Sequence, residues 1–154
     1  IERLRREVAM IDISRNAAPE LDPDGMVLGP KVLLVDEFSA SDGDIVAYRF
    51  KKHGLGPVIG KRTWGGVVGI RGSLPLLDGG FLYRPEYSRY DAEGTEWIME
   101  GVGVEPDIAV DNDPSREFAG VDDQLERAIA EIKELMKKRP AAIPPPPPYP
   151  DKSK

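Results

Sequence analysis

Residues 38–45, Phe-Ser-Ala-Ser-Asp-Gly-Asp-Ile, form a run of small and acidic residues between two more regular segments. The preceding residues 31–36, Lys-Val-Leu-Leu-Val-Asp, are nearly all apolar and predict a strand buried on both faces of a parallel sheet. The following residues 45–53 predict a helix, and Gly54 suits its C-terminal end. Together the three segments predict a strand–turn–helix unit of an α/β fold.

Ser41 lies in the turn of this unit, at the carboxyl edge of the predicted sheet, where open α/β folds keep their sites. The first turn of the next helix presents free backbone N–H groups at the same place. This position suits Ser41 as a nucleophile and the N–H of Asp42 as an oxyanion donor. The alternative interpretation of the local pattern is that Ser39 and Ser41 only cap the helix.

Further short runs follow the turn in a fixed order, namely Tyr48–Phe50, Leu55–Gly60, Thr63–Ile70 and Gly101–Ile108. With these runs, the chain from about Lys31 to Asp113 resembles the C-terminal catalytic part of the tricorn-like serine peptidases, relatives of the C-terminal-processing (tail-specific) proteases. The resemblance implies a crotonase-like core, hydrolysis of peptide substrates through an acyl-enzyme, and no cofactor. It also implies a homo-oligomer for the full-length protein, and we expect a cytoplasmic location.

The resemblance also indicates which base assists the serine. Tail-specific proteases use a lysine in a Thr-aromatic-Gly-Lys-Gly run, but here that position holds Gly66. Tricorn-like enzymes use a histidine from well upstream, oriented by a glutamate whose position is occupied here by Glu100. Composition alone favours the alternative that Glu100 is an exposed carboxylate at a strand end. His53 is the chain's single histidine, and we expect its helix to hold it too far from Ser41.

Gly69, Ile70 and Arg71 match the segment that runs alongside the bound peptide in the relatives, as β-strand addition requires. The alternative is an ordinary strand with a solvated Arg71. Trp64 is expected in the core. Because no His, Asp or Glu cluster has the spacing of metal ligands, we expect no metal site.

The fold class expected for the chain is α/β, with a mixed sheet of parallel βαβ character and packed helices. Strands are predicted at residues 57–60, 67–71, 81–84, 95–99 and 108–110, and helices at 1–10 and 122–139. Within the first region, residues 17–30 are predicted to be a loop. Three regions follow: 1–30 as an N-terminal helix and loop, 31–139 as the catalytic core, and 140–154 as a proline-rich disordered tail.

Composition excludes several other classes of protein. The 154 residues are one domain's worth of chain, and 40% hydrophobic residues suffice for a core. The net charge of -6 and the lack of a basic block argue against nucleic acid as a partner. No cysteine is present, and no apolar stretch approaches the length of a membrane span. Two alternatives to the peptidase remain, a non-catalytic peptide-binding module and a crotonase-like acyl-CoA enzyme.

Overall fold

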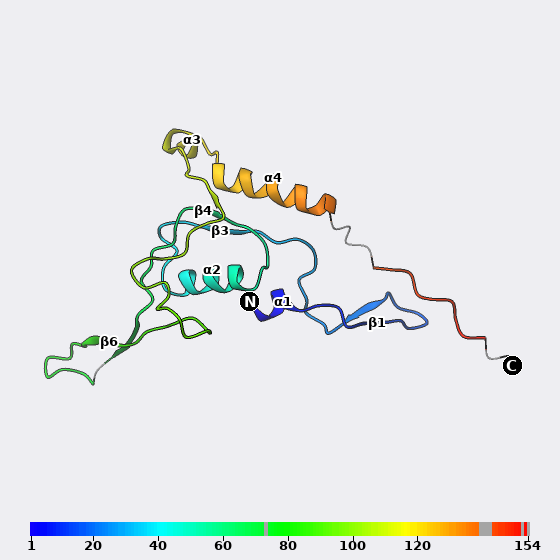
Figure 1. Ribbon diagram of the computed structural model, residues 1–154, viewed down its shortest axis with the longest axis horizontal. Helices are drawn as coiled ribbons and strands as arrows, with labels where there is room; N and C mark the ends of the chain where they lie inside the picture. The colour runs from blue at the N-terminus through cyan, green and yellow to red at the C-terminus, as the bar shows by residue number, and fades with distance from the viewer. Residues whose placement is uncertain (73, 139–142, 152, 154) are drawn as a thin grey trace.

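A three-stranded parallel sheet forms the centre of the computed structural model (Figure 1). Its strands are β3 (Leu33–Val35), β4 (Val58–Gly60) and β7 (Ile108–Ala109), in the order β3-β4-β7. All three residues of β4 are buried, as expected for the middle strand of a parallel sheet covered on both faces. The structure describes all residues except 73, 139–142, 152 and 154.

The predicted strand–turn–helix unit is confirmed. Helix α2 (Asp42–Lys52) joins β3 to β4, and the two strands pair in parallel with Leu33 opposite Val58. The helix begins at Asp42 rather than at Ile45, because the acidic residues of the turn belong to its first turn, where a carboxylate is favourable beside the helix dipole. The carboxyl end of β3 therefore leads through a short turn directly into α2.

Two helices cover opposite faces of the sheet (Figure 1). On one face, α2 buries Ile45, Ala47 and Phe50 against the sheet residues Val35 and Val58. Complete burial of a side chain as large as Phe50 contributes about 1.5–3 kcal/mol. These contacts fix the angle at which the start of α2 meets the sheet.

On the other face, α4 (Asp123–Lys138) packs on β3 and β4. The predicted helix is confirmed, except that its last residue, 139, lies outside the described residues. Recurring apolar residues predicted this helix, but of its described residues Ala128 is buried while Leu125, Ile129 and Met136 are exposed. The three short strands thus leave several large side chains of α4 uncovered.

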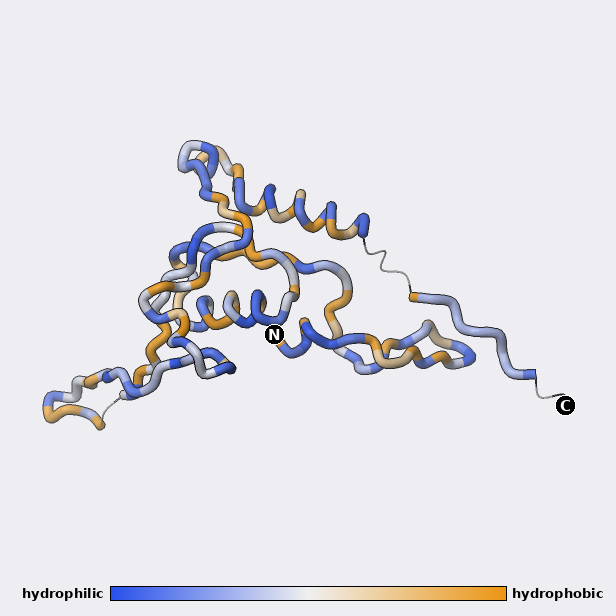
Figure 2. Tube along the Cα trace, viewed as in Figure 1, coloured by the Kyte–Doolittle hydropathy of each residue, from blue (hydrophilic) through white to orange (hydrophobic). Residues whose placement is uncertain are grey.

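Two antiparallel hairpins extend from the central layers in different directions (Figure 1). One pairs β1 (Met10–Asp12) with β2 (Glu20–Asp22), and the other pairs β5 (Gly69–Gly72) with β6 (Tyr83–Tyr87). The parallel character of the sheet was therefore predicted correctly, but the antiparallel strands form separate sheets. Figure 2 shows apolar residues near the tip of the second hairpin, where Leu77 and Phe81 are exposed.

Several predicted boundaries were wrong. The N-terminal helix is limited to α1 (Glu2–Arg5), because the alternating run around Ile11 pairs with β2 inside the predicted loop. The predicted strand at 95–99 is absent, since Trp97 makes one isolated bridge to Tyr90. Residues 95–99 contain bends and this single bridge instead of a strand. Trp64, which was expected in the core, is 62% exposed.

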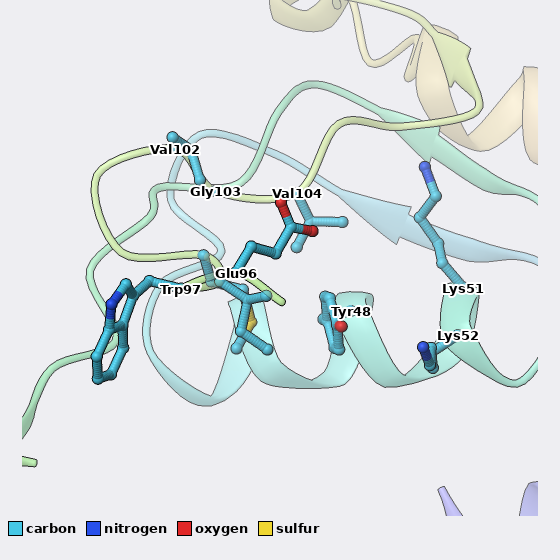
Figure 3. A pocket seen from close by; sticks show the side chains of 10 residues that line it. Tyr48, Lys51, Lys52, Glu96, Trp97, Val102, Gly103 and Val104 are labelled. Carbon is cyan, nitrogen blue, oxygen red and sulfur yellow. The ribbon is translucent and has the colours of Figure 1, made fainter. Parts of the chain in front are cut away.

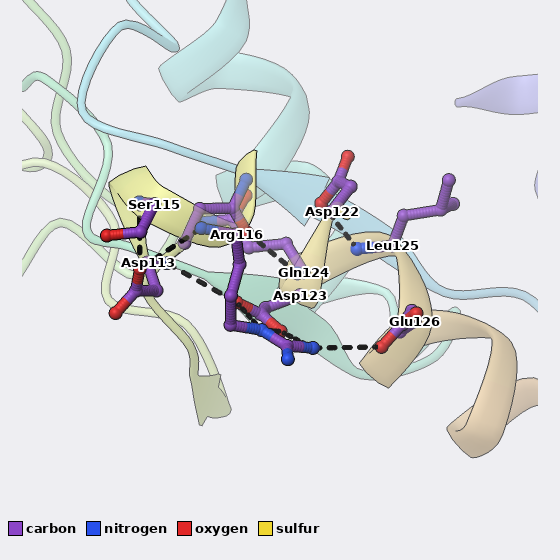
Figure 4. Close-up of polar contacts among 9 residues, drawn as sticks. Asp113, Ser115, Arg116, Asp122, Asp123, Gln124, Leu125 and Glu126 are labelled. Atoms are coloured by element: carbon purple, nitrogen blue, oxygen red, sulfur yellow. Dashed lines mark hydrogen bonds and ion pairs between the residues drawn. The ribbon is translucent and has the colours of Figure 1, made fainter. Parts of the chain in front are cut away.

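A short helix that the sequence analysis missed, α3 (Pro114–Phe118), precedes α4 (Figure 4). Asp113 caps it by accepting hydrogen bonds from the N–H groups of Ser115 (2.8 Å) and Arg116 (3.2 Å). The Arg116 guanidinium lies 2.8 Å from the carboxylate of Asp123 and thereby ties α3 to the start of α4. An Asp-Pro pair at the N-terminus is a helix-start signal that was available in the sequence.

None of the described helices is long and apolar enough to cross a membrane. The described residues of the proline-rich tail, 143–151 and 153, have no regular secondary structure. The division into regions 1–30, 31–139 and 140–154 stays a prediction.

Candidate active site

Ser41 occupies an unusual backbone conformation between β3 and α2. Its φ is 53° and its ψ is -104°, in a region that non-glycine residues adopt only at a cost of about 1–3 kcal/mol. Although Ser41 is the N-cap residue of α2, its side chain makes no capping hydrogen bond. The capping interpretation therefore fails for the Ser41 hydroxyl, which is left available for chemistry.

Ser39 is engaged in the turn instead. Its hydroxyl donates to Asp36 Oδ1 at 2.8 Å and accepts from the Asp36 N–H at 3.1 Å. Its carbonyl oxygen accepts from the N–H of Trp64 at 3.2 Å. The two serines thus differ in role, since Ser39 fastens the turn while the Ser41 side chain is not used to hold it.

The first turn of α2 presents a free donor next to Ser41. The N–H of Gly43 donates to Ala40 O at 2.8 Å, but within the described part of the chain no acceptor takes the N–H of Asp42. The positive end of the helix dipole lies at the same place. An anion that forms beside the Ser41 hydroxyl can therefore be held by the Asp42 N–H.

Asp44 joins this helix turn to the loop that carries the glycine pair. Its carboxylate is completely buried, and Oδ1 accepts from Thr63 Oγ1 at 2.5 Å and from the Gly65 N–H at 2.8 Å. Thr63 also accepts from the N–H of Val104 at 2.8 Å and donates its own N–H to Val104 O at 3.1 Å. Three segments that are distant in sequence therefore meet at one side chain.

Glu100 is held against the continuation of the same loop. Its Oε2 accepts from the N–H groups of Val67 at 2.7 Å and Val68 at 2.8 Å. The next residue, Gly101, donates its N–H to Gly65 O at 2.8 Å. Two backbone bonds to one oxygen fix the orientation of the carboxylate, so Glu100 is not simply a solvated residue at a strand end.

The glycine pair allows this close approach. Gly65 has a φ of 86°, and a Cβ added to it would lie 2.6 Å from the backbone nitrogen of Gly103. A larger residue at position 65 would push the loop away from the segment of Glu100. Gly66 carries no ionisable side chain, so the loop supplies no base at the position used by the tail-specific proteases.

His53 and Lys61 are both poorly suited to act as the base for Ser41. His53 is the C-cap of α2, and the 11-residue helix separates it from the N-cap Ser41 by about 18 Å at about 1.5 Å per residue. Its pKa lies below the ordinary value because of desolvation and the nearby positive charges of Arg5 and Arg49. The pKa of Lys61 is raised by its hydrogen bond to Glu37, so this lysine remains protonated near neutral pH.

The predicted substrate-binding residues lie on β5. Gly69 is buried, and a Cβ added to it would collide with the Tyr87 ring, whose nearest atom would be 1.9 Å away. Ile70 is 63% exposed, and Arg71 pairs with Glu86 at 2.9 Å. In the described sheets β5 pairs with β6 alone, which leaves its other edge unpaired. An extended peptide can therefore be added at this edge.

A cavity of about 280 Å³ lies alongside α2, between Tyr48 and the segment of Val104 (Figure 3). Its wall includes Lys52 and Trp97 but neither Ser41 nor Glu100. The cavity is therefore separate from Ser41. Among the described residues, no group of three or more His, Cys, Asp or Glu side chains could hold a metal ion.

Residues 7–110 match the model of the family described as Peptidase family S41. The chain belongs to peptidase family S41. It is 41% identical over 145 residues to "Tricorn protease homolog 1" of Streptomyces coelicolor, covering 94% of this chain and 14% of that protein. It is 40% identical over 129 residues to the tricorn protease of Thermoplasma volcanium, covering 84% of this chain and 12% of that protein.

A solved structure agrees with this assignment. The crystal structure of the tricorn protease superposes with a TM-score of 0.80 at 38% identity, over 87% of this chain and 13% of that chain. The resemblance inferred from the sequence motifs is thereby confirmed, together with the serine-peptidase character of the S41 family. The chain spans only about an eighth of the length of these tricorn relatives.

Sequence reasoning missed two residues that organise the site, Asp44 and Thr63. Asp44 appeared in it only as part of the turn, although an acidic residue in the first turn of a helix is a local signal. Thr63 gives no local signal, because its partners lie 19 and 41 residues away in the sequence. Only folding brings Thr63 next to its partners Asp44 and Val104.

Proposed function

We propose that Ser41 is the nucleophile of a tricorn-like serine peptidase and that this chain is the part of the enzyme that carries it. The single observation that supports this most is the backbone of Ser41, strained at φ 53° while its hydroxyl caps nothing. Strain at a residue whose side chain has no structural use is typical of catalytic positions. The free N–H of Asp42 beside it adds the donor that acyl transfer needs.

The proposed reaction is hydrolysis of a peptide bond in two steps. In the first, Ser41 Oγ bonds to the carbonyl carbon and gives its proton to a base, while the Asp42 N–H stabilises the oxyanion. The carbon–nitrogen bond then breaks, and the leaving amine takes the proton from the base. In the second step, the base takes a proton from water as the water oxygen bonds to the acyl carbon, and it gives this proton to Ser41 Oγ as the ester bond breaks and the carboxylic acid leaves.

The base is proposed to be a histidine outside these 154 residues, because the chain's single histidine lies at the far end of α2. Glu100 would orient that histidine through the carboxylate oxygen that Val67 and Val68 do not hold. Gly69, Ile70 and Arg71 would bind the peptide as an added strand along the free edge of β5. No step needs a cofactor.

The wider assembly belongs to the same proposal. By resemblance to the tricorn-like peptidases, we expect the full-length protein to be a homo-oligomer that acts on peptides in the cytoplasm. The core is expected to be of the crotonase-like type. Neither the peptide-binding module without catalysis nor the acyl-CoA enzyme explains a strained serine with a free hydroxyl.

A fluorophosphonate probe tests the proposal on the full-length protein. We expect labelling at Ser41, loss of labelling and of peptidase activity in Ser41→Ala, and retention of the fold. The matched control Ser39→Ala removes a hydroxyl from the same turn, where it only fastens Asp36, and should cost less than about tenfold in rate.

Three results would contradict the assignment. An inactive Ser39→Ala with a fully active Ser41→Ala would move the nucleophile to the other serine. Peptide binding without labelling would favour the peptide-binding module. Turnover of an acyl-CoA ester that survives Ser41→Ala would favour the acyl-CoA enzyme.

A further inference from the structure

Asp44 is an ionisable side chain in an environment that does not fully satisfy it. It is completely buried one helical turn after Ser41, and its second oxygen, Oδ2, has no hydrogen-bond partner among the described residues. Burying a carboxylate oxygen without a partner is unfavourable, and a buried polar group of this kind calls for an explanation. An apolar residue would avoid the cost, so the bonds made by the other oxygen have to matter.

Those bonds lie where no regular secondary structure holds the chain. Residues 61–68 and 101–107 belong to no helix or strand, so no ladder of backbone hydrogen bonds sets the distance between them and α2. Asp44 Oδ1 accepts hydrogen bonds from the Thr63 hydroxyl and the Gly65 N–H. The Thr63 hydroxyl in turn accepts a hydrogen bond from the N–H of Val104. One oxygen therefore connects the helix to both irregular segments.

The connection closes into a ring that contains the proposed catalytic groups. Starting from Ser41, the path runs through α2 to Asp44 and across to Gly65. Two residues further on, the N–H of Val67 holds Glu100, and the neighbour of Glu100 donates back to Gly65 O. The position of Glu100 relative to Ser41 thus depends on the bonds of Asp44.

We propose that Asp44 and Thr63 are positioning residues, which set the distance between the Ser41 hydroxyl and the carboxylate of Glu100. This inference rests on the proposed function of Ser41. A displacement of about 1 Å between groups that act together can cost about 10²-fold in rate without a loss of the fold. Neither residue has to touch the substrate.

The experiment compares rates of Ser41 labelling by a fluorophosphonate in the full-length protein. Thr63→Val keeps the size of the side chain but removes its hydroxyl, and we expect labelling about 10–100-fold slower. The final stoichiometry should stay at one probe per chain, because the molecules remain folded. With a peptide substrate, kcat should fall by the same factor while KM changes by less than about threefold.

Two controls separate positioning from stability. Thr63→Ser keeps the hydroxyl and should label within about threefold of the wild-type rate. Asp107→Ala matches Asp44→Ala, because the Asp107 carboxylate also holds a backbone N–H, that of Val58, at the amino end of β4 and away from Ser41. We expect Asp107→Ala to lower the unfolding temperature without slowing labelling, and Asp44→Ala to slow it.

Wild-type rates in Thr63→Val, a Thr63→Ser as slow as Thr63→Val, or an equal slowing in Asp107→Ala would each overturn the inference. If Asp44→Ala does not fold, the threonine pair still decides. A wild-type protein that is not labelled at Ser41 contradicts the proposed function itself, and the inference with it. A labelled wild type with an unaffected Thr63→Val overturns the inference alone.

Discussion

Asp91 shapes the turn that leads towards Glu100 by accepting three hydrogen bonds. Its donors are the N–H of Thr95 at 2.6 Å, the hydroxyl of the same residue at 2.5 Å, and the N–H of Glu96 at 3.0 Å. These bonds, above all that from the Thr95 side chain, lower the pKa of Asp91 from near 3.8 to about 2. A carboxyl whose pKa is lowered by folding stabilises the folded state above its unfolded pKa of about 3.9.

The stabilisation by Asp91 should therefore be lost as the pH falls from about 4 to about 2. In Asp91→Asn the amide oxygen can still accept the two N–H groups but does not titrate. We expect its urea midpoint to fall less steeply than that of the wild type over this interval. Thr95→Val, which removes the hydroxyl donor, should move the loss to higher pH. Parallel curves for all three proteins would contradict the assigned cause.

Lys61 offers a second prediction about a single residue. Its ammonium lies 2.7 Å from Glu37 and 3.2 Å from Asp111, and the pKa of Lys61 is raised by these partners. A protonated lysine cannot take the proton of Ser41. We expect the rate of acylation to fall at low pH as a group with a pKa of about 6.5, the ordinary value of histidine, becomes protonated. The same fall should occur in the wild type and in Lys61→Ala. If the titrating group in the pH profile of acylation disappears in Lys61→Ala, Lys61 is the base.

Whether a site residue could be predicted from the sequence depends on how local its partners are. Ser41 and Asp42 follow from a strand, a turn and a helix that are contiguous, so their pattern is complete within a short stretch. Glu100 was predicted only through the resemblance, because its partners Val67 and Val68 lie more than 30 residues away. The bond between Asp44 and Thr63 leaves no periodic pattern in either segment.

At the scale of elements, the side chain of Asp122 caps the start of α4, beside that of Asn112, which accepts the N–H of Gln124 at 2.9 Å. Asp122 accepts the N–H of Leu125 at 2.9 Å, as an N-cap does. Because α4 covers one face of the sheet, weakening its first turn should destabilise the whole domain. We expect Asp122→Ala to lower the free energy of unfolding by about 1 kcal/mol, and Asp122→Ser to lower it by much less.

Equilibrium urea denaturation, with an unchanged m-value, measures this effect. Asp151→Ala is a control of the same kind of substitution, because Asp151 also accepts a backbone N–H, that of Ser153, but does so in the tail outside any helix. It should leave the midpoint unchanged. If Asp122→Ala also leaves it unchanged, the cap does not contribute to the stability of the domain.

The sequence predicts long elements well, because their hydrophobic pattern extends over many more residues than the few by which their ends are misplaced. The helices α2 and α4 extend over 11 and 16 residues, and both were predicted. β1 and β2, of three residues each, were missed because a single pair of short strands gives almost no periodic signal. The predicted strand at 95–99 failed because the bonds of Asp91 bend the chain there, and side-chain-to-backbone bonds compete with strand pairing.

At the scale of the whole molecule, the chain contains some of the groups of the proposed peptidase site but no histidine near Ser41. The fold holds the proposed nucleophile Ser41, the proposed oxyanion donor Asp42 and the carboxylate of Glu100, while the single histidine lies at the opposite end of α2. The tricorn relatives are several times longer than this chain. We therefore propose that the histidine and a second oxyanion donor come from parts of the full-length protein outside these 154 residues. The activity of the isolated 154-residue chain therefore tests whether the base lies outside it.

We predict that the isolated chain folds but is inactive, or nearly so, towards peptides. Without a base the Ser41 hydroxyl stays protonated, and general-base assistance is typically worth about 10²–10⁴ in rate. A second oxyanion donor outside the chain could account for about 10²–10³ more, although losses within one catalytic unit do not simply multiply.

The measurement is a peptidase assay of the purified chain, shown to be folded by circular dichroism, beside the same chain mixed with the histidine-containing remainder of the full-length protein. Activity should appear only in the mixture and should depend on Ser41. Because His53 lies about 18 Å along α2 from Ser41, His53→Ala should change nothing in either sample. Robust turnover by the isolated chain that survives His53→Ala would show that a base inside these 154 residues activates Ser41, and would remove the reason to place the histidine elsewhere.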